Sequence, residues 1–138
     1  MTADEIMTDD VTTIDETATL AQAVEVMEER GIRHLPVVRG RELVGMLSDR
    51  DLRGYGVSMV NDVETLERLQ ARLGEPVSNA MSADVIRVGP ATDVPEVVDL
   101  LLEEHIHAVP VVDDDTDILI GIVSADDVLR AMRAKLAD

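Results

Sequence analysis

The sequence predicts a mixed α/β (α+β) fold in which one β-α-β-β-α unit occurs twice. Three observations support this fold class. The same short motifs occur in the same order in both halves of the 138-residue chain. Short apolar runs alternate with segments of helical periodicity in each half. Apolar residues make up 46% of the chain, and this length suits one compact domain rather than two large ones.

The internal repeat predicts the order of the elements. Pro36 and Pro110 lie 74 positions apart, whereas Gly45 and Gly121 lie 76 positions apart. The second copy is therefore two residues longer in the Asp-rich segment before Leu119, which we expect to form a hairpin loop. The matching segments are 7–14 and 81–88, 31–38 and 105–112, and 43–48 and 119–124.

The first copy contains clear signals for helix and strand ends. Thr19, with Gln22 three residues later, is typical of a capping box. The run Leu43–Leu47 is continuously apolar, so we expect a strand buried on both faces. The predicted elements are a strand at 11–14, a helix from 20 that ends at Gly31, strands at 35–38 and 43–47 with Gly40 in the turn, and a helix that opens at Ser48.

The second copy predicts the same elements with one variation. Asp93 is the expected N-cap of its first helix, and Pro95 falls in the first turn, where its missing N–H is tolerated. The apolar stripe of that helix consists of residues 94, 97, 98 and 101. The other predicted elements are strands at 85–88, 109–112 and 118–123, and a helix from Ser124 to about Leu136.

The segment between the copies is predicted to be a helix rather than a flexible linker. Apolar residues recur at positions 63, 66, 69 and 73, and Gly74 and Pro76 form a normal helix stop. The predicted organisation is repeat 1 at 1–60, a linker helix at 61–76 and repeat 2 at 77–138.

Composition excludes several classes of function. The net charge of −17 repels nucleic-acid phosphates and anionic membrane surfaces, and one aromatic residue in the whole chain leaves no stacking platform for bases. There is no cysteine, and no run is long enough to span a membrane. We expect a cytoplasmic protein that binds neither nucleic acid nor membrane.

These motifs resemble the CBS (cystathionine-β-synthase) domain family, in the tandem arrangement called a Bateman module. The resemblance rests on Ile-Met-Thr-x-Asp-Val at 6–11, Ile-Arg-His-Leu-Pro-Val-Val at 32–38 and Leu-Val-Gly-Met-Leu-Ser-Asp-Arg-Asp-Leu at 43–52, each with a counterpart in the second copy. It covers nearly the whole chain. It implies two pseudo-symmetric repeats packed as one module, with clefts between them that hold AMP, ADP, ATP, S-adenosylmethionine or NAD in relatives.

The resemblance also implies a stand-alone CBS-domain protein that regulates a separate, unknown partner. Pairs of this family often dimerise through their helices. The predicted helices at 20–29 and 94–104 have broad apolar faces that short strands cover only in part, so we expect a homodimer.

The Ser-x-x-Asp segments, Ser48 to Asp51 and Ser124 to Asp127, have two interpretations. Each follows a predicted strand and opens a helix, so each is an ordinary capping box. A helix start also presents N–H groups to a phosphate, and a carboxylate there can accept hydrogen bonds from ribose hydroxyls. The resemblance implies that these residues contact the nucleotide, and we favour that interpretation.

Basic residues precede the proline of the second strand in each copy. Arg33 and His34 occupy this place in the first copy and His107 in the second. An anionic ligand needs cations in so acidic a chain, and arginine binds phosphate in a bidentate manner. Surface ion pairs and solvated side chains are the alternative. The resemblance implies phosphate contact, which we expect for Arg33 above all.

The first strand of each copy is expected to contact the purine, as the resemblance implies. Successive residues of a strand point to opposite faces, so one of Thr12 and Thr13, and one of Ile86 and Arg87, faces the ligand. We predict Thr12 and Ile86. His105 has no predicted role.

No residue set for catalysis is present. The chain has no metalloprotease motif, P-loop or dinucleotide fingerprint, and we expect neither enzymatic activity nor a required cofactor. His105-Ile106-His107 is a weak metal motif, and Asp113–Asp117 is expected to be a solvated turn. The predicted function is a regulatory module whose ligand is an adenine nucleotide. The alternatives are a ligand-independent assembly module, or a sensor of S-adenosylmethionine, NAD or a divalent cation.

Overall fold

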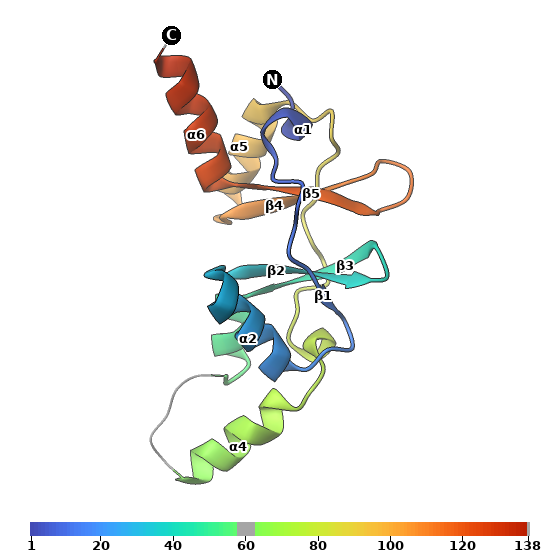
Figure 1. Ribbon diagram of the computed structural model, residues 1–138, viewed down its shortest axis with the longest axis vertical. Coiled ribbons are helices and arrows are strands. Elements are labelled where there is room, and N and C mark those ends of the chain that lie inside the picture. Colours follow the sequence, from blue (N-terminus) through green and yellow to red (C-terminus); the bar gives the residue numbers. More distant parts are fainter. Residues whose placement is uncertain (58–62, 138) are drawn as a thin grey trace. The chain divides into compact units, whose positions relative to one another are not determined.

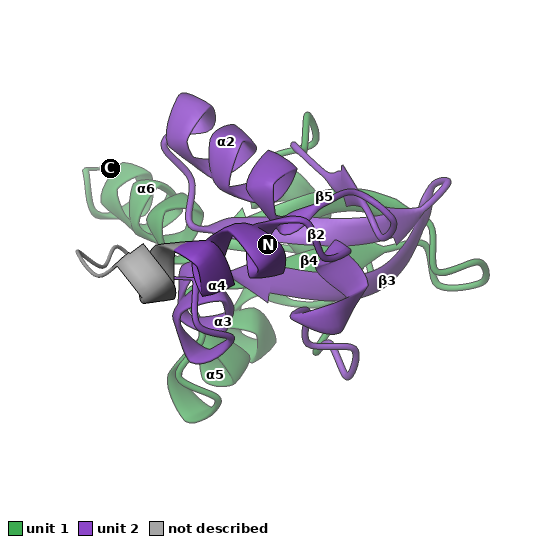
Figure 2. Ribbon diagram, turned by 90° about the horizontal axis from the view of Figure 1, so that it is seen from below, with its two compact units in different colours: residues 1–11, 86–138 green, residues 12–85 purple. Residues whose placement is uncertain are grey.

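The computed structural model describes residues 1–57 and 63–137, and for residues 63–66 it describes the backbone alone. The chain forms two compact units, each with its own small sheet and helices (Figures 1 and 2). Unit 2 consists of residues 12–85, and unit 1 consists of residues 1–11 together with 86–138. The mixed α/β class predicted from the sequence is confirmed, because each unit combines a small sheet with helices.

Unit 2 has a three-stranded sheet of order β1-β2-β3, in which β1 pairs in parallel with β2, and β2 and β3 are antiparallel. Pro36 lies opposite Met46, and Val37 lies opposite Gly45. Its elements are β1 (Ile14–Asp15), α2 (Leu20–Arg30), β2 (His34–Arg39), β3 (Glu42–Ser48), α3 (Asp49–Gly54), α4 (Val63–Leu73) and the 3-10 helix η1 (Val77–Asn79).

Unit 1 has the antiparallel pair β4-β5, in which Pro110 lies opposite Ile122 and Val111 lies opposite Gly121. These pairs repeat the β2-β3 register one copy later, and both hairpins contain a register shift after this point. The elements of unit 1 are α1 (Ala3–Ile6), α5 (Val94–Glu103), β4 (Ala108–Val112), β5 (Leu119–Ser124) and α6 (Ala125–Leu136).

Local signals in the sequence set the ends of α2. The Thr19 side chain accepts the Gln22 N–H, and the Gln22 side chain accepts the Thr19 N–H, which completes the predicted capping box. Gly31 ends the helix at φ +63°, a left-handed conformation that glycine adopts without steric cost. Gly40 has φ +66° in the β2-β3 turn, where the sequence placed it.

Three predictions about the strands were wrong in detail. The strand expected at 11–14 pairs at Ile14–Asp15, and the one expected at 85–88 is reduced to a single bridge from Val88 to Val111. The run 43–47 alternates between buried and half-buried residues, because one face of β3 covers the unit 2 core while the other stays partly accessible. The predicted N-cap position of Asp93 is confirmed in α5, where its side chain makes no cap hydrogen bond.

Each unit has its own apolar core. In unit 2 the core lies between α2 and the sheet and includes Leu20, Leu35, Val37, Leu47 and Val77, all fully buried. The core of unit 1 contains the equivalent strand residues, together with one residue of α1 and two of α5: Ala3, Val88, Val97, Leu101, Val109, Val111 and Val123. Aliphatic side chains therefore fill both cores, as the composition indicated.

Each unit includes a segment from the start of the other repeat. Thr8, near the start of repeat 1, pairs with Ile122 of β5 through two backbone hydrogen bonds of 2.9 Å. Ser82, near the start of repeat 2, pairs with Met46 of β3 in the same way, at 2.8 and 2.9 Å. Both segments thus extend the exposed edge of a short sheet, whose N–H and C=O groups need partners.

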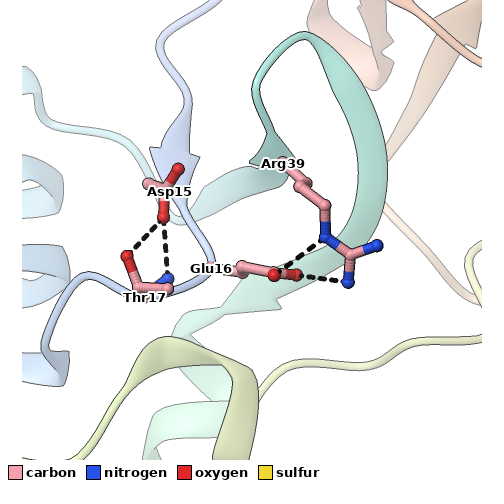
Figure 3. Close-up of polar contacts among 4 residues, drawn as sticks. All are labelled: Asp15, Glu16, Thr17 and Arg39. Atoms are coloured by element: carbon pink, nitrogen blue, oxygen red, sulfur yellow. Dashed lines mark hydrogen bonds and ion pairs between the residues drawn. The ribbon is translucent and has the colours of Figure 1, made fainter.

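Polar contacts also attach the end of β1 to β2 (Figure 3). The Arg39 guanidinium donates to both carboxylate oxygens of Glu16, at 2.9 and 3.2 Å, which raises the pKa of Arg39. The Thr17 hydroxyl and amide both donate to Asp15, at 2.6 and 2.9 Å, and lower the pKa of its carboxyl. These exposed contacts define the corner after β1 and belong to the scaffold.

Candidate functional site

The carboxylate of Asp51 lies where β3 gives way to α3. Ser48 is the N-cap residue, and its Oγ accepts the Asp51 N–H at 3.0 Å. In return, Asp51 Oδ2 accepts the Ser48 N–H at 2.9 Å. The predicted capping box is therefore present, and it engages one of the two carboxylate oxygens.

Asp127 is held in the same way between β5 and α6. Ser124 Oγ accepts the Asp127 N–H at 3.1 Å, and Asp127 Oδ2 accepts the Ser124 N–H at 2.9 Å. Asp127 is 7% exposed and is the one buried charged residue among those that the structure describes, whereas Asp51 is half-buried. Capping and ligand contact are compatible, because each cap leaves the other oxygen, Oδ1, for a further donor.

The second oxygen of each carboxylate faces the segment taken from the other repeat. Ser82 Oγ donates to Asp51 Oδ1 at 3.4 Å, and Thr8 Oγ1 donates to Asp127 Oδ1 at 3.4 Å. Both distances are long for an O–H···O bond, so each hydroxyl is a weak partner. Asp127 Oδ1 also accepts a bond from Arg130, at 2.8 Å.

The predicted phosphate-binding residues lie directly beside these helix starts. The carbonyl of Arg33 accepts the Asp49 N–H at 3.0 Å, and the carbonyl of His107 accepts the Ala125 N–H at 2.9 Å. Arg33 and His107 therefore occupy equivalent places, and their side chains are exposed. His34 is half-buried and lies opposite Ser48 in the sheet, as Ala108 lies opposite Ser124.

The residues predicted to contact the purine lie just before the first paired residue of each repeat: Thr12 precedes β1, and Ile86 precedes the bridge at Val88. Thr12 and Ile86 are half-buried, and each belongs to the same unit as the carboxylate of its repeat. Thr13 is exposed. The Arg87 guanidinium forms an ion pair of 3.4 Å with Asp117, which lies in the turn between β4 and β5. Unit 2 thus contains Thr12, Arg33, His34, Ser48 and Asp51, and unit 1 contains Ile86, His107, Ser124 and Asp127.

Three residues that contact the carboxylates were not identified from the sequence. Thr8 and Ser82 occupy equivalent positions in the Met-Thr and Met-Ser motifs, so the repeat itself could have indicated them. Arg130 lies three residues after Asp127, a spacing at which helix side chains meet. In the described part of the chain, no group of three His, Cys, Asp or Glu side chains is arranged to hold a metal ion.

No helix among the described residues is both long and apolar enough to cross a membrane.

Comparisons with known proteins match both halves of the chain. Residues 3–58 and 77–134 match the CBS domain family. Protein MJ1225 from Methanocaldococcus jannaschii is 30% identical over 132 residues, which cover 91% of this chain and 47% of that protein. The chain therefore spans about half the length of this relative.

Two solved structures are similar over nearly their full length. The AcuB protein from Vibrio cholerae has a TM-score of 0.82 and 28% identity, with 99% of this chain and 93% of that chain covered. CBSX2 from Arabidopsis thaliana in complex with AMP has a TM-score of 0.81 and 29% identity, with 97% of each chain covered. Because the family match covers both repeats, and both repeats form the same strand-helix junction, this chain belongs to the CBS domain family as a tandem CBS pair.

Proposed function

We propose that this CBS pair is a regulatory module that binds an adenosine-containing ligand through the carboxylates of Asp51 and Asp127. One observation carries the proposal: each Asp caps its helix with Oδ2, while Oδ1 has a weak hydroxyl partner in both units and, at Asp127, Arg130 as a second partner. Ribose presents two vicinal hydroxyls, and hydrogen bonds from hydroxyls to a charged carboxylate are about twice as strong as neutral ones. The AMP complex of CBSX2 supports this ligand class.

The neighbouring residues suit the rest of such a ligand. The carbonyls of Arg33 and His107 accept N–H groups at the starts of the two capped helices, so a basic residue lies beside each Ser-x-x-Asp motif. The Arg33 guanidinium offsets part of the repulsion that a phosphate meets in a chain of net charge −17. Thr12 and Ile86 remain our candidates for contact with the base, and Ser48 and Ser124 for a further hydrogen bond.

Regulation requires that the ligand bind two conformations with different affinity. In this proposal, ligand binding at the two carboxylates shifts the module towards one of its conformations. A separate protein, not yet identified, responds to that shift. No catalytic step is part of the proposal.

The test is calorimetric titration with AMP, ADP, ATP, S-adenosylmethionine and NAD, beside the melting temperature. We expect at least one of them to bind, and Asp51→Ala and Asp127→Ala to weaken that binding by roughly ten- to a hundredfold each at its own site. Loss of the cap alone costs about 1 kcal/mol of stability and leaves affinity unchanged.

Asp49→Ala and Asp126→Ala are the matched controls, because each removes the same charge from the first turn of the same helix. If the parent binds an adenosine ligand and both Asp variants bind it equally well, the ribose assignment is wrong. If the parent binds none of the five compounds, the ligand-independent assembly module becomes the better account.

A further inference from the structure

Asp51 and Asp127 differ in which residue lies three positions later, almost one helical turn along the same helix. Position 54 is glycine and position 130 is arginine, and each lies three residues after its Asp. Residues at this spacing share a helix face. Arg130 Nη2 donates to Asp127 Oδ1 at 2.8 Å, and the two side chains are 60% and 7% exposed respectively.

This contact fills Asp127 Oδ1. A carboxylate oxygen accepts about two hydrogen bonds, and Asp127 Oδ1 already accepts them from Arg130 and Thr8. Among the described residues, the donor at Asp51 Oδ1 is the Ser82 hydroxyl alone, at 3.4 Å. A ligand hydroxyl can therefore approach Asp51 without displacing a charged partner, whereas at Asp127 it must compete with a guanidinium.

We propose that Arg130 is a positioning residue that sets the difference between the two sites, by occupying the oxygen of Asp127 that a ribose hydroxyl needs. The inference rests on the proposed function, in which ribose hydroxyls bind these carboxylates. The Asp51 site is then the tighter of the two, and the Asp127 site fills at higher ligand concentration. One module thereby responds to two concentration ranges of the same ligand.

The size of the effect follows from the exposure of Arg130. Ion pairs with an exposed partner contribute little, so removing this one changes affinity by about two- to fivefold rather than by orders of magnitude. Because the exposed guanidinium is screened by salt, the difference between the sites also decreases as ionic strength rises.

The first experiment isolates the Asp127 site in the Asp51→Ala variant of this chain. It measures the binding of AMP and of uncharged adenosine by calorimetry. Adding Arg130→Ala is expected to tighten binding of both compounds by about two- to fivefold. Arg130→Lys keeps the charge and restores most of the parent affinity. Arg133→Ala is the control, because it removes the same charge one turn further along α6 and leaves the Asp127 contact in place.

The second experiment makes the reciprocal change in the Asp127→Ala chain. A Cβ at Gly54 meets no atom within 4 Å, so a side chain can begin there without a clash, and Gly54→Arg is the variant to use. It is expected to weaken binding of AMP and adenosine at Asp51 by about two- to fivefold, while Gly54→Ala leaves affinity unchanged.

The outcomes separate this inference from the proposed function. If Arg130→Ala weakens AMP but not adenosine, Arg130 binds phosphate and the inference is overturned. It is also overturned if Arg130→Ala and Gly54→Arg leave both affinities unchanged, or if no binding appears in the Asp51→Ala chain with or without Arg130. Failure of the unmodified chain to bind any of AMP, ADP, ATP, S-adenosylmethionine and NAD refutes the proposed function itself.

Discussion

At the scale of single residues, the structure explains why Met and Gly recur in both copies. The position that a Cβ would take on Gly45 lies 2.4 Å from the Met81 sulfur and 3.1 Å from the Ser82 carbonyl oxygen. Gly121 has the same relation to the Met7 sulfur, at 2.3 Å, and to the Thr8 carbonyl oxygen, at 3.1 Å. Each glycine therefore lets a methionine and its backbone approach the strand closely.

Gly45→Ala is expected to lower the free energy of unfolding by about 1–3 kcal/mol, because the added methyl group overlaps both the Met81 side chain and a backbone oxygen. Met81→Ala removes the larger obstacle, so Gly45→Ala should cost less in that background. A double-mutant cycle by denaturant titration measures this coupling. Gly54→Ala serves as the control, since its Cβ meets no atom within 4 Å. Additive costs of the two substitutions would contradict the close approach.

At the scale of elements, the chain's single aromatic residue links α3, α4 and the segment that follows α4. The Tyr55 hydroxyl donates to Glu75 Oε2 at 2.5 Å, and the Arg72 guanidinium lies 5.0 Å from the Tyr55 ring centroid. Glu75 raises the pKa of Tyr55, chiefly through this hydrogen bond. The sequence predicted the helix α4, but only the structure showed that Tyr55, at the end of α3, contacts it through Arg72. Two of the apolar positions behind that prediction, 63 and 66, lie outside the residues whose side chains are described.

Tyr55 is expected to ionise above the ordinary tyrosine pKa, as followed by absorbance of the tyrosinate in an alkaline titration. Its protonated form is favoured in the fold. The stability from this contact is therefore complete below the unfolded-state pKa and is lost as the pH rises through the raised value. Glu75→Gln should return the pKa towards its ordinary value, whereas Glu67→Gln on the exposed side of α4 should leave it raised. An ordinary pKa in the parent would argue against the contact in solution.

At the scale of the whole molecule, large apolar side chains remain exposed on two helices of unit 1. Leu102 on α5 is 68% exposed, and Leu129 and Leu136 on α6 are 65% and 86% exposed. Met132 lies between the last two on α6. The homodimer expected from the sequence rested on 20–29 and 94–104. The exposed apolar side chains of α6 make this helix a further candidate for the dimer interface, because exposed apolar patches mark interaction sites.

We expect light scattering at micromolar concentration to give the mass of a dimer, with or without AMP. Leu129→Glu combined with Leu136→Glu should shift the mass towards that of a monomer, because burying the new carboxylates at an apolar interface is costly. Ala91→Glu with Thr13→Glu adds the same charge at exposed positions outside these helices and should leave the mass unchanged. A monomer mass for the parent would end the dimer proposal.

The sequence by itself determined what local chemistry controls. The capping boxes at Thr19, Ser48 and Ser124 depend on hydrogen bonds between residues three apart, and the left-handed Gly31 and Gly40 depend on the absence of a side chain. The order of the elements followed from the repeat. The short pairing at Ile14 and the single bridge at Val88 were not predictable in extent, because pairing depends on a partner strand rather than on strand propensity.

The tertiary structure alone decided which segments complete each sheet and each carboxylate. Thr8 and Asp127 are 119 positions apart, and Ser82 and Asp51 are 31 apart. Apolar periodicity shows that a segment is buried but does not name its partner, so the sequence could not show that each unit includes the first segment of the other repeat. The sequence therefore indicated the two Ser-x-x-Asp motifs, and the fold decided that Asp127 meets Thr8 while Asp51 meets Ser82.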